Sequence, residues 1–151
     1  KLQSGIPPIA KLIRNGILVA LGTDGASSNN NLDMQEEMKM VALISKTDMN
    51  EMPLSSKEIL TMATESGAKA YRINAGKIAI GSLADCILVN MNDERMTPCH
   101  DIASNWIYAA NSSAIDSVMC NGKFVMRNRH VEGEEDIVKE AQACVKDLVA
   151  R

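Results

Sequence analysis

The sequence predicts an α/β fold, and three observations support this prediction. Residues 17–21 form an apolar run without polar alternation, which is typical of a strand buried on both faces of a parallel sheet. A short helical pattern precedes this run, so that the two together form an αβ unit. An Asn-Gly pair at 121–122 separates two apolar stretches and predicts a β-hairpin. We expect an α/β first half and a β-rich region from about Gly76 to His130.

The first elements follow from proline, glycine and apolar spacing. Two prolines and then apolar residues at i, i+3 and i+4 predict a helix within residues 6–15. Asn15-Gly16 should end this helix, because glycine readily adopts the left-handed conformation of a helix C-cap. The buried strand at 17–21 is then expected to follow directly.

Two capping signatures predict the next helices. Asp33 with Glu36, and Ser55 with Glu58, have the spacing of a capping box. The first helix carries an apolar stripe: Met34, Met38, Val41, Leu43 and Ile44. The second continues to about Tyr71 with a mostly small apolar face: Ile59, Met62, Ala63, Ala68 and Ala70.

The second half predicts strands and a final helix. Residues 83–89 form a strand-like run, and 115–120 with 123–126 flank the Asn-Gly turn. Residues 134–151 have helical periodicity. Their expected apolar face consists of Ile137, Ala141, Cys144, Val145 and Leu148.

Composition limits the functional classes. The chain has 151 residues, 46% hydrophobic and 23% charged, which is enough for a globular domain with a core. The net charge of -3 provides no basic footprint for nucleic acid and no cationic face for a membrane. No apolar run approaches the ~20 residues of a membrane span. The four cysteines lack CxxC spacing, so we expect buried, reduced thiols and a cytoplasmic protein.

Asp24 is the residue with the strongest chemical signal. It directly follows the expected strand, and ligands bind at the carboxyl ends of strands in parallel sheets and β/α barrels. However, Asp24-Gly25 is also an ordinary turn pair. Residue chemistry alone favours neither interpretation. A phosphate-binding loop is less favoured, since the glycines match neither common phosphate-loop motif.

Four stretches, in order along the chain, carry a family resemblance. Residues 22–34, with Glu-Glu-Met at 36–38, resemble the end of the eighth barrel strand in the amidohydrolase superfamily. They are most similar to the branch of 5′-methylthioadenosine/S-adenosylhomocysteine deaminases and related chlorohydrolases. Residues 1–8 are similar to the segment before that strand, 80–89 to the family's G-x-LAD strand, and 116–123 to its closing hairpin.

The resemblance implies a specific architecture. The expected fold is the C-terminal part of a metal-dependent (β/α)8 barrel plus part of a small β-sandwich domain. Residues 1–75 would be the C-terminal end of the barrel, 76–132 the sandwich portion, and 133–151 a C-terminal amphipathic helix. We therefore expect the C-terminal piece of a longer enzyme.

The resemblance also implies a reaction. In this family Zn²⁺, or sometimes Fe²⁺, is held by four histidines and the aspartate that Asp24 matches. The metal lowers the pKa of its bound water to about 7, and the aspartate accepts the proton as hydroxide attacks. In the deaminase branch the attack is on C6 of an adenine ring and expels ammonia. Ser27, Ser28 and Asn29 would lie beside the substrate.

The rest of the implied metal site is missing from the sequence. The chain contains only two histidines, His100 and His130, and neither lies in a His-x-His. We expect both to be exposed. One carboxylate does not hold a catalytic zinc, which needs three or more protein ligands, so this piece should retain no metal and be inactive alone. Its expected partners are a purine nucleoside substrate and either other copies or the missing N-terminal portion, with no nucleic acid or membrane.

Two alternatives stay open at this point. The same superfamily includes triazine chlorohydrolases and guanine deaminases, and the substrate-contacting residues would lie mostly upstream of Lys1. The chain could also be a non-catalytic scaffold or interaction module in which Asp24 is a turn residue.

Overall fold

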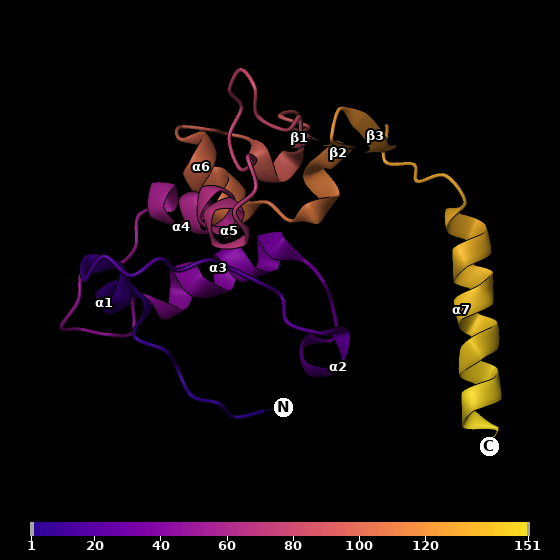
Figure 1. The fold of residues 1–151 in the computed structure, drawn as a ribbon, viewed down its shortest axis with the longest axis horizontal. Coiled ribbons are helices and arrows are strands. Elements are labelled where there is room, and N and C mark those ends of the chain that lie inside the picture. The colour runs from indigo at the N-terminus through magenta and orange to yellow at the C-terminus, as the bar shows by residue number, and fades with distance from the viewer. Residues whose placement is uncertain (1, 151) are drawn as a thin grey trace.

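A computed structural model describes residues 2–150, and Figure 1 shows their mixture of helices and strands. None of the described helices is long and apolar enough to cross a membrane. The elements, in chain order, are α1 (Ile9–Arg14), α2 (Ala26–Asn29), α3 (Met34–Ile44), α4 (Ser56–Ala63), α5 (Glu65–Tyr71), β1 (Cys86–Val89), η1 (Glu94–Met96), α6 (Ile102–Ser104), η2 (Asn105–Ala109), η3 (Ser112–Ala114), β2 (Ile115–Cys120), β3 (Lys123–Met126) and α7 (Glu134–Val149).

Of the αβ unit predicted at the start of the chain, the structure confirms the helix, α1. Gly16 follows α1 with a φ of +74°, in the left-handed conformation that the sequence predicts. Residues 17–21 form no strand with any other part of 2–150, so the pairing predicted for this segment is not made by the described residues. Ile17 and Leu18 are each 52% exposed. A strand requires a ladder partner, and the backbone bonds here are to helices: Ile17 N donates to Leu12 O and Leu21 N to Met62 O, each at 3.1 Å.

The two predicted helix starts are confirmed, with one difference. Asp33 caps α3 by accepting from the backbone N–H groups of its second and third residues. Its capping box is incomplete, because the Glu36 carboxylate accepts from Asn31 instead. The Ser55–Glu58 capping box on α4 is complete. The helix expected to reach Tyr71 breaks at Thr64 (φ −130°, ψ −86°), which divides it into α4 and α5.

The hydrophobic core joins the two halves of the chain. Its fully buried large side chains are Ile59, Met96 and Ile107. Further buried core residues come from α1, α3, the loop before α4, α4 itself and the helical segment between β1 and β2: Ala10, Met38, Val41, Ala42, Leu54, Met62, Trp106, Ala110 and Ala114. Residues on both sides of the predicted 75/76 boundary thus share one core. On α3 the expected Leu43 is 49% exposed, and Ala42 takes its place in the core.

The second half contains one three-stranded antiparallel sheet in the order β1-β2-β3. Asn121 and Gly122 have φ values of +47° and +77°, so the predicted turn with two positive φ angles is confirmed. The predicted strand at 83–89 is shorter and begins at Cys86. Between β1 and β2, where the sequence predicts no particular strand, the chain folds into short helices that bury Met96, Trp106 and Ile107.

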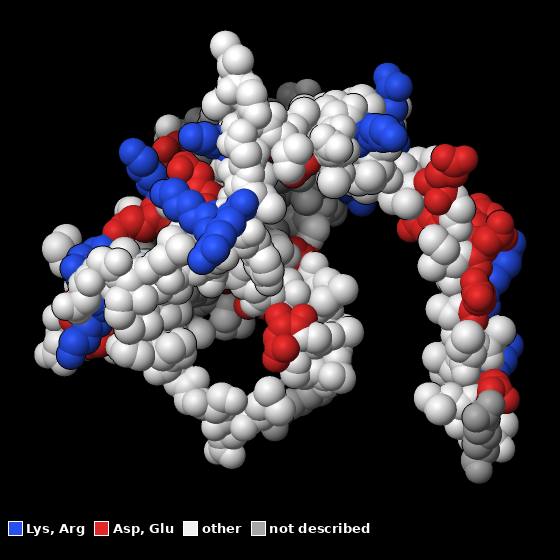
Figure 2. Space-filling view, viewed as in Figure 1, with Lys and Arg blue, Asp and Glu red and all other residues white. Residues whose placement is uncertain are grey.

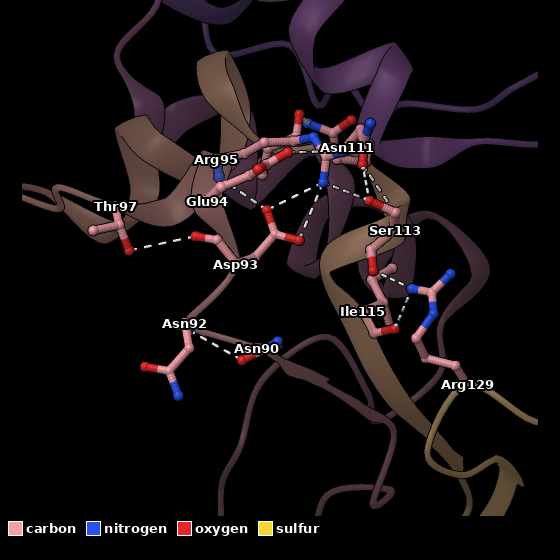
Figure 3. A network of polar contacts seen from close by, with 12 residues as sticks. Asn90, Asn92, Asp93, Glu94, Arg95, Thr97, Asn111, Ser113, Ile115 and Arg129 are labelled. Carbon is pink, nitrogen blue, oxygen red and sulfur yellow. Dashed lines mark hydrogen bonds and ion pairs between the residues drawn. The ribbon is translucent and has the colours of Figure 1, made fainter.

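A polar network, shown in Figure 3, holds this helical segment to the sheet. Arg95 Nη1 donates to Asp93 Oδ2 at 3.1 Å and to Ser113 Oγ at 2.9 Å. Arg129, beyond β3, donates to the carbonyls of Ser113 and Ile115. The beginning and end of the segment are therefore tied to each other and to the start of β2.

The last helix, α7, differs from all the others in its surroundings. It forms where the periodicity predicts, yet none of its residues is buried, and Figure 1 shows it apart from the rest of the chain. Cys144 on α7 is exposed, as are Cys99 and Cys120, while Cys86 is half-buried. The predicted burial of the thiols is therefore wrong, because they lie on surface loops, the sheet and this uncovered helix.

Candidate functional site

The candidate site is centred on Asp24, in the loop between residues 17–21 and α2. Its backbone has a φ of +59°, in the left-handed region that aspartate tolerates better than most residues. The Gly25 N–H donates to Asp24 Oδ1 at 2.7 Å, and the Ser28 hydroxyl donates to Oδ2 at 2.8 Å. Both carboxylate oxygens are therefore oriented by the loop, while the residue itself is exposed.

These contacts favour the charged form of Asp24. The hydrogen bond from Ser28, and then that from the Gly25 amide, hold the pKa of this carboxyl below its ordinary value of 3.8, outweighing the opposing desolvation. Asp24 is consequently ionised at neutral pH. An oriented, ionised carboxylate can bind a cation or accept a proton.

The neighbouring residues with predicted substrate roles have different surroundings. Ser27 is exposed in α2. Ser28 is half-buried, and its hydroxyl contacts both Asp24 and the Gly25 carbonyl, the latter at 2.9 Å. Asn29 is also half-buried, and its Nδ2 donates to Thr23 O at 2.9 Å and to a carboxylate of α3 at 2.7 Å. The structure thus brings Ser28 and Asn29 to the loop that carries Asp24.

Two polar residues of α3 are not predicted from the sequence: Glu37 contacts this loop, and Gln35 anchors the helix that carries Glu37. Gln35 is only 4% exposed, and Glu37 receives the bond from Asn29. Glu37 is half-buried. A signal for Gln35 existed: it lies three residues before Met38 and seven before Ala42, so it shares their helix face. A polar residue on the apolar face of a helix needs a buried partner.

The described residues do not form a complete metal site. Across residues 2–150, no group of three or more His, Cys, Asp and Glu side chains is arranged to hold an ion. His100 and His130 are exposed, as predicted. Figure 2 shows acidic side chains at the edge of an opening through the lower part of the molecule, near the place of α2 in Figure 1. Asp24 would supply one ligand, and a catalytic zinc requires at least two more from the protein.

Comparison with known proteins identifies the family. The amidohydrolase family model matches residues 1–125. The chain belongs to the amidohydrolase family. This confirms the family resemblance carried by the loop around Asp24, the stretch at 80–89 and the closing hairpin.

Among curated relatives, this amidohydrolase chain is similar to the 5′-deoxyadenosine deaminase of Methanosphaera stadtmanae. The two are 46% identical over 98% of this chain and 36% of the relative. It is 40% identical to the 5-methylthioadenosine/S-adenosylhomocysteine deaminase of Syntrophomonas wolfei, over all of this chain and 36% of the relative. The chain therefore spans about a third of the length of these relatives.

Solved amidohydrolase structures resemble it over nearly all of its length. An adenosine deaminase from Xanthomonas campestris with bound zinc superimposes with a TM-score of 0.93 at 30% identity, covering 100% of this chain and 36% of that one. The zinc complex of the atrazine chlorohydrolase TrzN from Arthrobacter aurescens has a TM-score of 0.83 at 29% identity, covering 90% and 31%. The arrangement of residues 2–150, α7 included, thus occurs within a much longer enzyme.

Proposed function

We propose that this chain is part of a metal-dependent aminohydrolase that deaminates adenine nucleosides of the 5′-deoxyadenosine or 5′-methylthioadenosine/S-adenosylhomocysteine type. The observation that carries the proposal is the oriented, ionised carboxylate of Asp24 in a chain of this family. The deaminase names of these two relatives support the substrate class.

The proposal assigns a limited role to the residues of this chain. Asp24 would be one ligand of the catalytic metal and would accept the proton of the attacking water. A bound zinc would supply that water in activated form. Ser27 and Ser28 would lie at the rim of the nucleoside pocket, where Ser28 also orients Asp24. The remaining ligands would come from outside this chain, because the described residues do not complete the site.

The proposed architecture is the end of a (β/α)8 barrel followed by part of a β-sandwich. Residues 17–21 would be a barrel strand, with 1–75 in the barrel, 76–132 in the sandwich portion and 133–151 as a separate helix. The half-exposed Ile17 and Leu18 support this, because flanking strands and helices of a barrel would cover them.

A chimera tests the proposal. The segment of the Methanosphaera stadtmanae deaminase that matches this chain is replaced by residues 1–151, and ammonia release from 5′-deoxyadenosine is measured. We expect activity, and we expect Asp24→Asn to reduce kcat/KM by about 10³-fold or more. The matched control is Asp48→Asn. Asp48 is also exposed, and its Oδ1 also accepts a hydrogen bond from a backbone N–H, that of Asn50, at 3.0 Å.

Two outcomes would count against the proposal. A chimera that binds zinc and folds but releases no ammonia would contradict the deaminase assignment. Full activity of Asp24→Asn would contradict the role of Asp24 and favour a scaffold. The structural likeness to atrazine chlorohydrolase makes a triazine the second substrate to assay, and chloride release in place of ammonia would favour that branch.

A further inference from the structure

The side chain of Asn29 joins the Asp24 loop to helix α3. Its Nδ2 donates to the Thr23 carbonyl at 2.9 Å and to Glu37 Oε1 at 2.7 Å. An amide nitrogen has two hydrogens to donate, so both are used by these internal acceptors. The –NH₂ group of Asn29 is therefore committed to holding the loop.

The Thr23 carbonyl belongs to the peptide unit that ends at the Asp24 nitrogen. A bond to this carbonyl restrains rotation of that peptide plane, and with it the positive φ of Asp24. The bonds from Gly25 and Ser28 hold the carboxylate relative to its own loop, since both donors lie within the next four residues. The bond from Asn29 to Glu37 joins the loop to α3, and the same amide holds the Thr23 carbonyl. Asn31, nearer the helix, donates to Glu36 of α3 but not to Thr23.

The start of α3 is itself anchored to a distant part of the chain. Gln35 Nε2 donates to the carbonyls of Trp106 and Ala110, both at 2.8 Å, and this side chain is buried. Asp33, which caps α3, also accepts from the Ser112 hydroxyl. Glu37 is thus presented to Asn29 from a helix whose first turn is fixed against η2 and η3.

We propose that Asn29 is a positioning residue for Asp24, which connects the catalytic loop to α3 and does not bind substrate through its amide nitrogen. This proposal rests on the proposed function of Asp24. It assigns to Asn29 a role different from the substrate contact that its place in the motif implies.

Kinetics of the chimera test the role. We expect Asn29→Ala to lower kcat by about 10- to 100-fold, as for other residues that orient a catalytic group, while KM changes by less than about twofold. Asn31→Ala is the matched control, because its amide also donates to a carboxylate of α3, that of Glu36, but makes no bond to the Thr23 carbonyl. A rise in KM at constant kcat for Asn29→Ala would overturn the proposal in favour of substrate binding, and so would unchanged kinetics.

A measurement on the 151-residue chain separates this inference from the proposed function. Backbone ¹⁵N heteronuclear NOEs at residues 23–25 report the order of the loop. We expect Asn29→Ala to lower these NOE values and Asn31→Ala to leave them unchanged. Both variants should keep the circular dichroism spectrum of the unsubstituted chain, which shows that they fold. Equal NOEs in the two variants would overturn the positioning role. An unsubstituted chimera that folds and binds zinc but is inactive would contradict the proposed function, and the NOEs would still decide whether Asn29 orders the loop.

Discussion

Helices α3 and α7 are both amphipathic, and their surroundings are opposite. In its 11 residues α3 buries Gln35, Met38, Val41 and Ala42. In its 16 residues α7 buries none, and its Ile137 and Leu148 are 62% and 72% exposed. The comparison teaches that apolar periodicity predicts which face of a helix seeks cover, whereas the presence of a partner depends on the rest of the fold.

The helix starts differ in the same direction. The Asp33 side chain caps the N-terminus of α3 and accepts a hydrogen bond from Ser112 of η3. One residue therefore both caps the helix and joins it to the rest of the fold. Helix α7 begins after Gly133 without a side-chain cap, with Glu134, Glu135 and Asp136 in its first turn. Those acids favour the helix through its dipole, but they provide no tertiary contact.

The largest expected effect is in the core that α3 and α4 share. Ile59 has no exposed surface, so Ile59→Ala should lower the free energy of unfolding by about 2–5 kcal/mol through lost burial and a cavity. The measurement is urea unfolding followed by fluorescence of Trp106, the single, buried tryptophan. A loss below about 1 kcal/mol would mean that this core is not tightly packed.

The next effect concerns the buried polar contact of α3. Gln35→Leu leaves the Trp106 and Ala110 carbonyls without this donor, which should cost about 1–3 kcal/mol. Gln142→Leu is the control, because it makes the same change on exposed α7 and should stay within about 0.5 kcal/mol. Equal effects of the two substitutions would remove the distinction between the helices.

The capping box of α4 should contribute less. Ser55→Ala removes the hydroxyl that accepts from the Glu58 N–H, and we expect a loss of about 1 kcal/mol. Glu132→Ala, an exposed change just before α7, should stay within about 0.5 kcal/mol. Thermal unfolding by circular dichroism compares the two, and an unchanged Tm for Ser55→Ala would refute the contribution of the box.

The Glu58 carboxylate of the same capping box should make the stability of the fold depend on pH in the acid range. Burial raises the pKa of Glu58, but hydrogen bonds from Ser55 and the contact with Arg14 outweigh it, so the pKa lies below its ordinary value of 4.5. Because the folded pKa is depressed, the stabilisation is present above pH 4.5 and is lost as pH falls through the folded pKa. In urea unfolding between pH 6 and 3, the free energy of unfolding should fall less for Glu58→Gln than for the unsubstituted chain. Parallel pH profiles of the two proteins would exclude a contribution of the Glu58 carboxylate to acid sensitivity.

The smallest expected effect is on α7. Leu148→Ala removes a side chain that contacts no core, so unfolding followed at Trp106 should change by less than about 0.5 kcal/mol. A loss above 1 kcal/mol that grows with protein concentration would show that another copy covers this helix, as self-association requires.

The sequence by itself determined the local elements and the family. Proline and glycine placed α1, side-chain oxygens at Asp33 and Ser55 started two helices, and Asn121-Gly122 formed the hairpin turn. Each depends on residues within a few positions of one another. The motif around Asp24 likewise indicated an amidohydrolase, which the family match confirms.

Only the tertiary structure decided what lies against these elements. Residues 17–21 have strand-like composition, but a strand needs a paired backbone, and no partner for it occurs among the described residues. The helix pattern places Gln35 on the apolar face of α3, but its partners are carbonyls 71 and 75 positions away, which no local pattern identifies. The hydrogen bond from Asn29 to Glu37 depends on how the Asp24 loop folds back against α3. Local patterns therefore set conformation, whereas burial and polar pairing depend on contacts made when distant segments pack together.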